Sequence, residues 1–119
     1  MPFTIPVQDD SIHGSIDDLL QLRTPSVYLV RVEGDSMQGA GIFSGDLLIV
    51  DKGIEARHGH IVIAALNGDA YCKRMVVRDG MVILAPENSK YPSRYIMAGD
   101  HFEVWGVVTH SIRDHDRRL

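Results

Sequence analysis

Two dipeptides, Asn67-Gly68 and Asp79-Gly80, constrain the fold of this 119-residue chain more than any other feature. Each one separates two stretches that are rich in apolar and β-branched side chains. Asn and Asp tolerate a positive φ angle and Gly favours one, so both dipeptides are strong signals for two-residue hairpin loops. The sequence therefore predicts strands over residues 60–66, 69–78 and 81–85, joined as a meander with 69–78 in the centre.

Further strands are predicted on both sides of this meander. Residues 26–33 are rich in β-branched and aromatic side chains, and residues 47–50 form a short apolar run between turn residues, as in a buried strand. Residues 102–111 form the last predicted strand. The expected fold class is mainly β, with curved, twisted antiparallel sheets.

The first 25 residues differ from the rest of the chain. They carry three of its five prolines, and Ser15 followed by Asp18 resembles the start of a short helix. We expect an N-terminal arm over residues 1–25, one β domain over 26–112 and a C-terminal tail over 113–119.

Composition excludes several classes of protein. No apolar run approaches the ~18 residues of a membrane span, so no membrane association is expected. The single cysteine, Cys72, rules out an intramolecular disulfide framework and is typical of a reducing cytoplasm. The formal net charge is −4, and basic residues cluster only near the end of the chain. Direct DNA binding is therefore not expected, since that function normally needs a concentrated basic face.

The hairpin register places Lys73 opposite Val62 and Pro86, on the face that also carries Tyr71 and Met75. It has no acidic partner at its own level of the sheet. Desolvation disfavours an ammonium ion, so the pKa of this amine should be lowered, and a neutral amine can act as a general base. On the strand pattern alone, the commoner arrangement is a lysine that reaches the strand edge and stays charged.

Ser36 follows a predicted strand, in the turn Gly34-Asp35-Ser36-Met37. A serine hydroxyl is a poor nucleophile until an adjacent base removes its proton, and Ser-Lys pairs are one solution to this problem. The backbone amides of Asp35 and Ser36 are candidates to stabilise an oxyanion. Taken alone, Gly-Asp-Ser is also an ordinary turn.

Considered together, these residues resemble the self-cleaving serine peptidase family of the LexA repressor and the UmuD mutagenesis protein. The resemblance covers about residues 25–112, with Lys73 37 positions after Ser36 as in the family. The matching stretches are Gly34-Asp35-Ser36-Met37, residues 45–51, residues 58–64, Cys72-Lys73-Arg74, Pro86-Glu87-Asn88 and residues 104–108.

Within the family the chain is most similar to the UmuD and MucA branch, through residues 23–30 and 105–110. The resemblance implies a homodimer, with Ser36 and Lys73 as catalytic residues and no cofactor. It also implies self-cleavage stimulated by the RecA filament on single-stranded DNA. The processed product would then join a UmuC-like translesion DNA polymerase.

Three departures from the family pattern matter. Family members cut themselves at an Ala-Gly or Cys-Gly bond before the serine, and residues 1–35 offer only His13-Gly14. Ala40-Gly41 and Ala98-Gly99 lie downstream within expected structure and are not proposed. The chain therefore resembles the processed form. His60 stands where an acidic residue is common, and Cys72, on the face opposite Lys73, is expected to have no catalytic role.

Other functions remain open at this point. The chain is also similar to the C-terminal autocleavage and dimerisation domain of a LexA- or phage-type repressor. Coding sequence upstream of Met1 would distinguish a UmuD-like protein from such a repressor. A binding module with a vestigial Ser-Lys pair is a further alternative. No metal site is expected, because spacing suggests no third ligand for His58 and His60.

Overall fold

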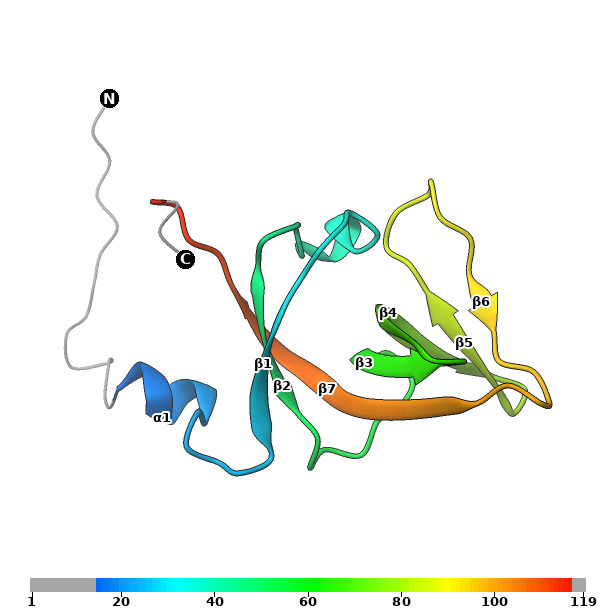
Figure 1. Cartoon of the computed structure of the whole chain (residues 1–119), viewed down its shortest axis with the longest axis horizontal. Coiled ribbons are helices and arrows are strands. Elements are labelled where there is room, and N and C mark those ends of the chain that lie inside the picture. The colour runs from blue at the N-terminus through cyan, green and yellow to red at the C-terminus, as the bar shows by residue number, and fades with distance from the viewer. Residues whose placement is uncertain (1–14, 117–119) are drawn as a thin grey trace.

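The structure, a computed structural model, describes residues 15–116 of the chain. It contains one open, twisted antiparallel sheet in the order β1-β2-β7-β3-β4-β5-β6 (Figure 1). This confirms the predicted mainly β fold. The strands are β1 (Val27–Arg31), β2 (Leu47–Asp51), β3 (Ile61–Leu66), β4 (Asp69–Arg78), β5 (Met81–Ala85), β6 (Arg94–Tyr95) and β7 (Phe102–Ile112).

Both predicted hairpins form, with the predicted register. Leu66 pairs with Asp69 across the first loop, and Val62 pairs with Lys73 further along the same two strands. Asn67 has a φ angle of 51° and Gly68 one of 90°, so both loop residues lie in the left-handed region. The Asp79-Gly80 loop has the same character, with φ angles of 51° and 75°. The meander β3-β4-β5 therefore follows from two local turn signals.

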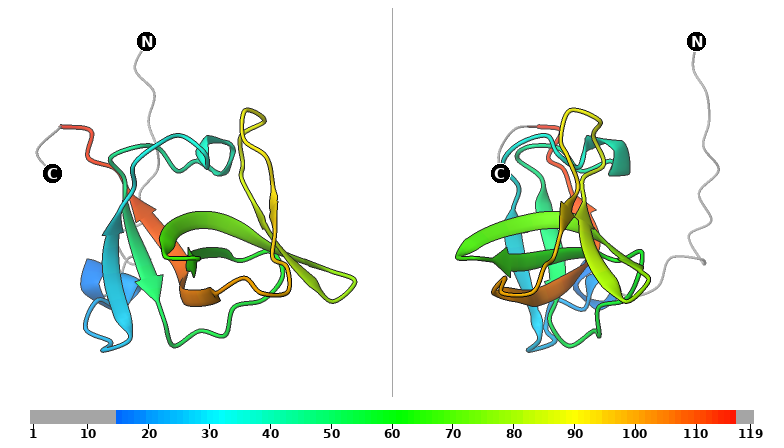
Figure 2. Two further views of the ribbon diagram at one scale, coloured as in Figure 1. Left: turned by 45° about the vertical axis from the view of Figure 1, so that its right-hand side comes forward. Right: turned by 90° about the vertical axis from the view of Figure 1, so that its right-hand side faces the viewer.

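Strand β7 joins the two halves of the sheet (Figure 2). One part of it pairs with β2 and another with β3, and Val107 pairs with both Asp51 and Val62. The register shifts at two places, leaving Trp105 and Thr109 as extra residues on β7. Such bulges bend a strand and increase its twist, which lets β7 pair with both halves of the sheet although they lie at an angle to one another.

Two clusters of buried side chains form the core, and alternate residues of β3 point into different clusters. The first cluster contains Val32, Met37, Ile42, Leu48, Val50 and Ile63. The second contains Val62, Ala64, Leu66, Met75, Leu84 and Val107. The predicted face of β4 is correct, because Met75 packs in the second cluster while Cys72 packs against the first.

Gly106 allows β7 to lie close to its neighbours. A Cβ atom at this position would be 2.5 Å from Val50 Cγ1. Beside it, the Tyr28 hydroxyl donates a 3.0 Å hydrogen bond to the Trp105 carbonyl oxygen, which ties β1 to β7. A side chain at position 106 would therefore push β7 away from the first half of the sheet.

Asp46, directly before β2, is a buried carboxylate with 1% of its surface exposed. Arg113 donates to it through Nε at 2.9 Å and Nη2 at 3.1 Å, and the Phe43 amide donates at 2.9 Å. The Arg113 guanidinium also stacks over the Phe43 ring, 4.2 Å from its centroid. These donors satisfy the carboxylate. They also dock a residue that sequence reasoning placed in the C-terminal tail.

Helix α1 (Ile16–Leu20) begins where the capping pattern predicts. The Ser15 hydroxyl accepts from the Asp18 amide at 3.2 Å, and the Asp18 carboxylate accepts from the Ser15 amide at 3.4 Å. The rest of the expected arm, residues 1–14, and residues 117–119 of the expected tail lie outside the described residues. Within 15–116, no helix is long and apolar enough to cross a bilayer.

Two short elements were not expected from the sequence. They are β6 and a 3₁₀ helix over Gln38–Ala40, directly after the Ser36 turn. Elements of two or three residues are too short to produce a periodic pattern.

Candidate active site

Ser36 and Lys73 lie together in the structure. Ser36 is in the turn that follows β1, and Lys73 is in the middle of β4. The Lys73 Nζ atom lies 2.6 Å from the Ser36 Oγ atom, at hydrogen-bonding distance. Met37, only 2% exposed, packs in the first core cluster and anchors the chain directly after the serine. Two residues 37 positions apart are thus brought into contact by the sheet.

The surroundings of Lys73 disfavour its charged form. Burial lowers the pKa of the amine below the ordinary lysine value, and among residues 15–116 no carboxylate pairs with it. The ring of Tyr91 covers the amine, with its centroid 5.8 Å from Nζ. The side chain points at Ser36, so it does not take the edge-seeking arrangement that the strand pattern alone favours.

The turn that carries Ser36 is held against the segment after β5. The Glu87 amide donates to the Ser36 carbonyl oxygen at 2.8 Å, and the Glu87 carbonyl oxygen accepts from the Gly39 amide at 2.7 Å. Asn88 Nδ2 donates to the Asp35 carbonyl oxygen at 2.9 Å. Three hydrogen bonds therefore connect the turn to one short segment.

Glu87 is itself held from the sheet. Arg74 Nε donates to its carboxylate at 2.5 Å, and Arg74 Nη1 donates to the Gly59 carbonyl oxygen at 2.6 Å. Arg74 follows Lys73 on β4. Two consecutive residues of β4 thus support the site. Lys73 contacts Ser36, and Arg74 contacts Glu87, whose segment holds the Ser36 turn.

Of the two predicted oxyanion donors, the Ser36 amide donates no hydrogen bond to a protein atom within residues 15–116. The Asp35 amide interacts with the carboxylate of its own residue. Their role stays a prediction.

The Asp35 side chain has partners that sequence reasoning missed. Its carboxylate accepts a short hydrogen bond from the Tyr91 hydroxyl and pairs with Lys90 Nζ at 3.0 Å. These contacts hold the pKa of Asp35 below its usual value, with the Tyr91 hydrogen bond the largest cause and Lys90 the next. The two partners lie in a loop more than fifty positions away, and nothing in the local pattern marks them.

A pocket of about 220 Å³ opens beside the amine of Lys73. Its lining is mostly apolar and includes Leu66, Leu84, Tyr91 and Pro92, with Lys73 and Arg94 as its charged residues. A pocket of this character suits an apolar side chain.

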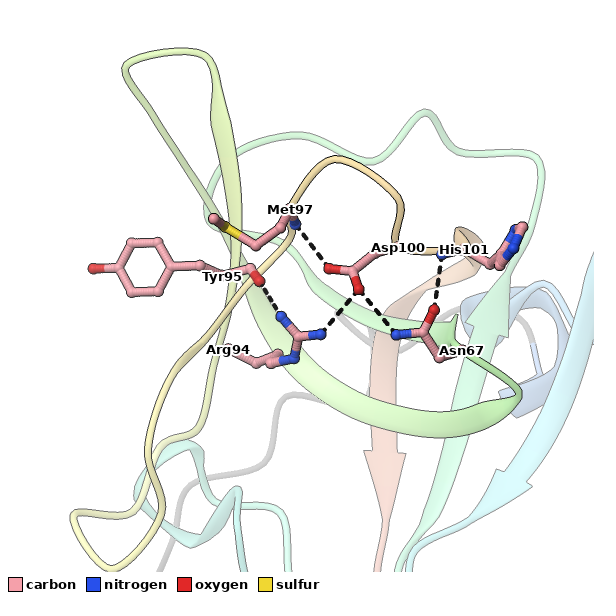
Figure 3. Close-up of polar contacts among 6 residues, drawn as sticks. All are labelled: Asn67, Arg94, Tyr95, Met97, Asp100 and His101. Atoms are coloured by element: carbon pink, nitrogen blue, oxygen red, sulfur yellow. Dashed lines mark hydrogen bonds and ion pairs between the residues drawn. The ribbon is translucent and has the colours of Figure 1, made fainter.

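Arg94, at the pocket rim, is fixed by the network in Figure 3. Its Nη2 donates to Asp100 at 3.1 Å, and Asp100 also accepts from Asn67 Nδ2 at 3.0 Å and the Met97 amide at 2.8 Å. Asn67 in turn accepts from the His101 amide at 2.9 Å. The hydrogen bond from Asn67 is the largest cause that lowers the pKa of Asp100, to about 2. Arg94 is therefore held by a carboxylate that is ionised at neutral pH.

The histidines considered for a metal site have other contacts. His58 Nδ1 accepts from the Val77 amide at 3.0 Å, and His60 Nδ1 accepts from the Arg57 amide at 3.0 Å. Over residues 15–116, no group of three or more His, Cys, Asp or Glu is arranged to hold a metal ion. His13 lies outside this range.

Comparisons with known proteins identify the family of this chain. The peptidase S24-like family matches residues 4–109. The MucA protein of Salmonella typhimurium is 40% identical over 96 residues, which cover 79% of this chain and 65% of MucA. The LexA repressor of Paracidovorax citrulli is 41% identical over 87 residues, covering 73% of this chain and 39% of the repressor. The chain thus spans less than two thirds of the length of these relatives. The predicted resemblance is confirmed, and the chain belongs to the peptidase S24-like family, together with MucA and the LexA repressor.

Proposed function

We propose that this protein is a self-cleaving serine peptidase of the LexA and UmuD type, in which Ser36 is the nucleophile and Lys73 the base. The observation that carries the proposal is the 2.6 Å contact between the Ser36 hydroxyl and an amine whose pKa is lowered by burial. A neutral amine at this distance can take the serine proton, which is what a hydroxyl needs to attack a peptide carbonyl.

The reaction follows from these positions. Ser36 Oγ attacks the carbonyl carbon while its proton passes to Lys73 Nζ. The carbonyl oxygen becomes an oxyanion that accepts hydrogen bonds from the amides of Asp35 and Ser36. When the carbon–nitrogen bond breaks, Lys73 returns the proton to the leaving amine and an ester remains on Ser36. Water then attacks the ester and gives a proton to Lys73, which returns it to Ser36 as the carboxylic acid leaves.

The proposed substrate is an extended segment of this protein or of its partner in a homodimer. The apolar pocket beside Lys73 supports this choice, because a segment in the site would place one side chain there. An extended peptide also pairs readily with a sheet edge.

In the cell, we propose the UmuD-like role: RecA–single-stranded DNA filaments stimulate cleavage, and the processed form serves a UmuC-like translesion polymerase in the cytoplasm. The support is the match to MucA, which spans more of that relative than the match to LexA does. The second candidate is the C-terminal domain of a LexA-type repressor, favoured by an identity of 41% to LexA itself.

Labelling with a fluorophosphonate tests the chemistry without knowledge of the natural substrate. Serine attack on phosphorus expels fluoride, so the label reports a Ser36 whose proton has a base to receive it. We expect labelling of the wild type, and of the exposed-residue controls Ser111→Ala and Lys52→Ala, but none of Ser36→Ala and a loss of at least ~100-fold in Lys73→Ala. Equal labelling of all five proteins would overturn the assignment.

Two further assays test the biological role. The wild type should cut a UmuD-like precursor in the presence of RecA filaments, whereas Ser36→Ala and Lys73→Ala should not. Co-purification with a UmuC-like polymerase supports the accessory role. If the polymerase co-purifies but Ser36 of the wild type is neither labelled nor able to cut the precursor, the results would instead favour a binding module with a vestigial Ser-Lys pair.

A further inference from the structure

We infer that Tyr91 is a positioning residue of this site: its hydroxyl holds the Asp35 carboxylate and thereby orients Ser36 toward Lys73. The inference rests on the proposed peptidase function. In this role the Tyr91 hydroxyl acts through Asp35, separately from the ring that covers the Lys73 amine.

The first step is the place of Asp35 in the turn. It directly precedes Ser36 and follows Gly34, whose φ angle is +91°. Glycine restricts the backbone little, so the chain is conformationally free just before Asp35 and Ser36. Because the peptide unit between Asp35 and Ser36 is planar, a restraint on Asp35 limits the directions in which Ser36 can leave it.

The second step concerns which contact supplies that restraint. Lys90 and Tyr91 both reach the Asp35 carboxylate, but the Lys90 side chain is 70% exposed. An exposed ion pair contributes little and is screened by salt. A hydrogen bond from a phenol to a carboxylate is charge-assisted and directional. Of the two partners of the carboxylate, Tyr91 is therefore the one that adds orientation to the turn, beside the backbone contacts of Glu87 and the Asn88 side chain.

The third step is that the ring and the hydroxyl of Tyr91 do different things. The ring lines the pocket and covers the Lys73 amine, with its centroid 5.8 Å from Nζ. The hydroxyl binds Asp35. Removing the hydroxyl alone should disturb the position of Ser36, whereas removing the ring should also rehydrate Lys73.

Tyr91→Phe and Tyr91→Ala separate these roles when fluorophosphonate labelling is followed across pH. We expect Tyr91→Phe to lower the plateau rate about tenfold, because the serine is misplaced, with the midpoint of the pH profile unchanged. Tyr91→Ala should lower the rate as well and move the midpoint to higher pH, because water then stabilises the ammonium. A structural role alone would not divide the two effects in this way.

Tyr95→Phe is the matched control. The Tyr95 ring points away from the network in Figure 3, and its hydroxyl makes no hydrogen bond within residues 15–116. This variant should be labelled at the wild-type rate. Lys90→Ala should change the rate by less than about twofold at physiological salt. Urea unfolding of each variant corrects the rates for any loss of folded protein.

A double-mutant cycle completes the test. If Tyr91 acts through Asp35, then Tyr91→Phe combined with Asp35→Ala should be no slower than Asp35→Ala alone. If the wild type is labelled and Tyr91→Phe is labelled at the same rate, this inference fails while the proposed function stands. It fails in the same way if the effects of Tyr91→Phe and Asp35→Ala multiply in the double mutant. Wild type that is not labelled at Ser36 overturns the proposed function and the inference with it.

Discussion

Gly39 and Glu87 are joined by a backbone hydrogen bond that connects two loops of the site. The Gly39 amide donates to the Glu87 carbonyl oxygen at 2.7 Å, and a Cβ atom on Gly39 would be 2.5 Å from that same oxygen. Since the Glu87 amide also holds the Ser36 carbonyl oxygen, any displacement of Glu87 reaches the serine.

Gly39→Ala should therefore impair the site. The new methyl group would push Glu87 away and loosen the Ser36 turn, so we expect fluorophosphonate labelling to fall about tenfold or more. Gly53→Ala is the control, because its Cβ atom would also be crowded, by Asp51 Oδ1 and Ser26 Oγ at 3.1 Å, but at the end of the β1–β2 pair away from Ser36. It should leave the labelling rate of the folded protein unchanged, whatever its effect on the free energy of unfolding. The opposite pattern would contradict this account of Gly39.

The reactivity of Ser36 should depend on pH through Lys73. Because burial lowers the pKa of Lys73, the labelling rate should rise with pH and reach half its plateau below the ordinary lysine value of about 10.4. If Lys73 were fully hydrated, the midpoint of the rate profile would instead lie at the ordinary lysine pKa. A midpoint at or above that value in the wild type would show that the amine is not desolvated.

Lys73→Met should stabilise the fold at neutral pH. The pKa of Lys73 is lower in the folded than in the unfolded chain, so the unfolded state binds more protons between the two values, and wild-type stability rises with pH across that window. Below the window the full cost of the buried charge is present, and methionine removes it. Urea unfolding should show a higher midpoint for Lys73→Met at neutral pH, with the difference closing above the unfolded pKa.

Asp46 should govern acid stability. The Arg113 hydrogen bonds are the largest cause that lowers the pKa of Asp46 from its ordinary value of 3.8. The stabilisation is therefore present above that value and is lost as pH falls through the lower, folded-state pKa. Asp46→Ala should cost about 2 kcal/mol at neutral pH, because it leaves charged and backbone donors unpaired. Urea titrations at neutral and acidic pH check this, and the variant should lose less stability on acidification than the wild type.

Cys72 should resist alkylation in the folded protein. Burial raises the pKa of its thiol from 9.0 to about 11. A rise of two units leaves about a hundredfold less thiolate at a given pH, and the thiolate is the reactive form. Iodoacetamide should modify the urea-unfolded chain about a hundredfold faster than the native one. Equal rates would mean that Cys72 is exposed to solvent.

The local features of the fold could be predicted from sequence because they depend on neighbouring residues. Asn67-Gly68 and Asp79-Gly80 specified both hairpins, and the pairing of Val62 with Lys73 followed by counting from the loop. The Ser15–Asp18 cap predicted the start of α1 for the same reason. The side-chain faces of β4 followed from alternation.

The features that depend on distant contacts could not be predicted. The bulges at Trp105 and Thr109 arise because β7 must pair with two strands at an angle, and no residue type marks them. The Asp35–Tyr91 contact and the docking of Arg113 on Asp46 join loops that only the folded sheet brings together. For the site, the residue types and family motifs indicated Ser36 and Lys73, whereas the loop that positions Ser36 appeared only in the structure.

The place of β7 in the sheet has a consequence for the newly made chain. Across residues 15–116, the half with β1 and β2, which leads to Ser36, and the half with β4, which carries Lys73, are joined in the sheet only through β7. That strand follows all the others in sequence, so a ribosome releases it after both reactive residues. On the proposed function, the growing polypeptide therefore lacks an assembled Ser36–Lys73 site until Phe102–Ile112 has emerged.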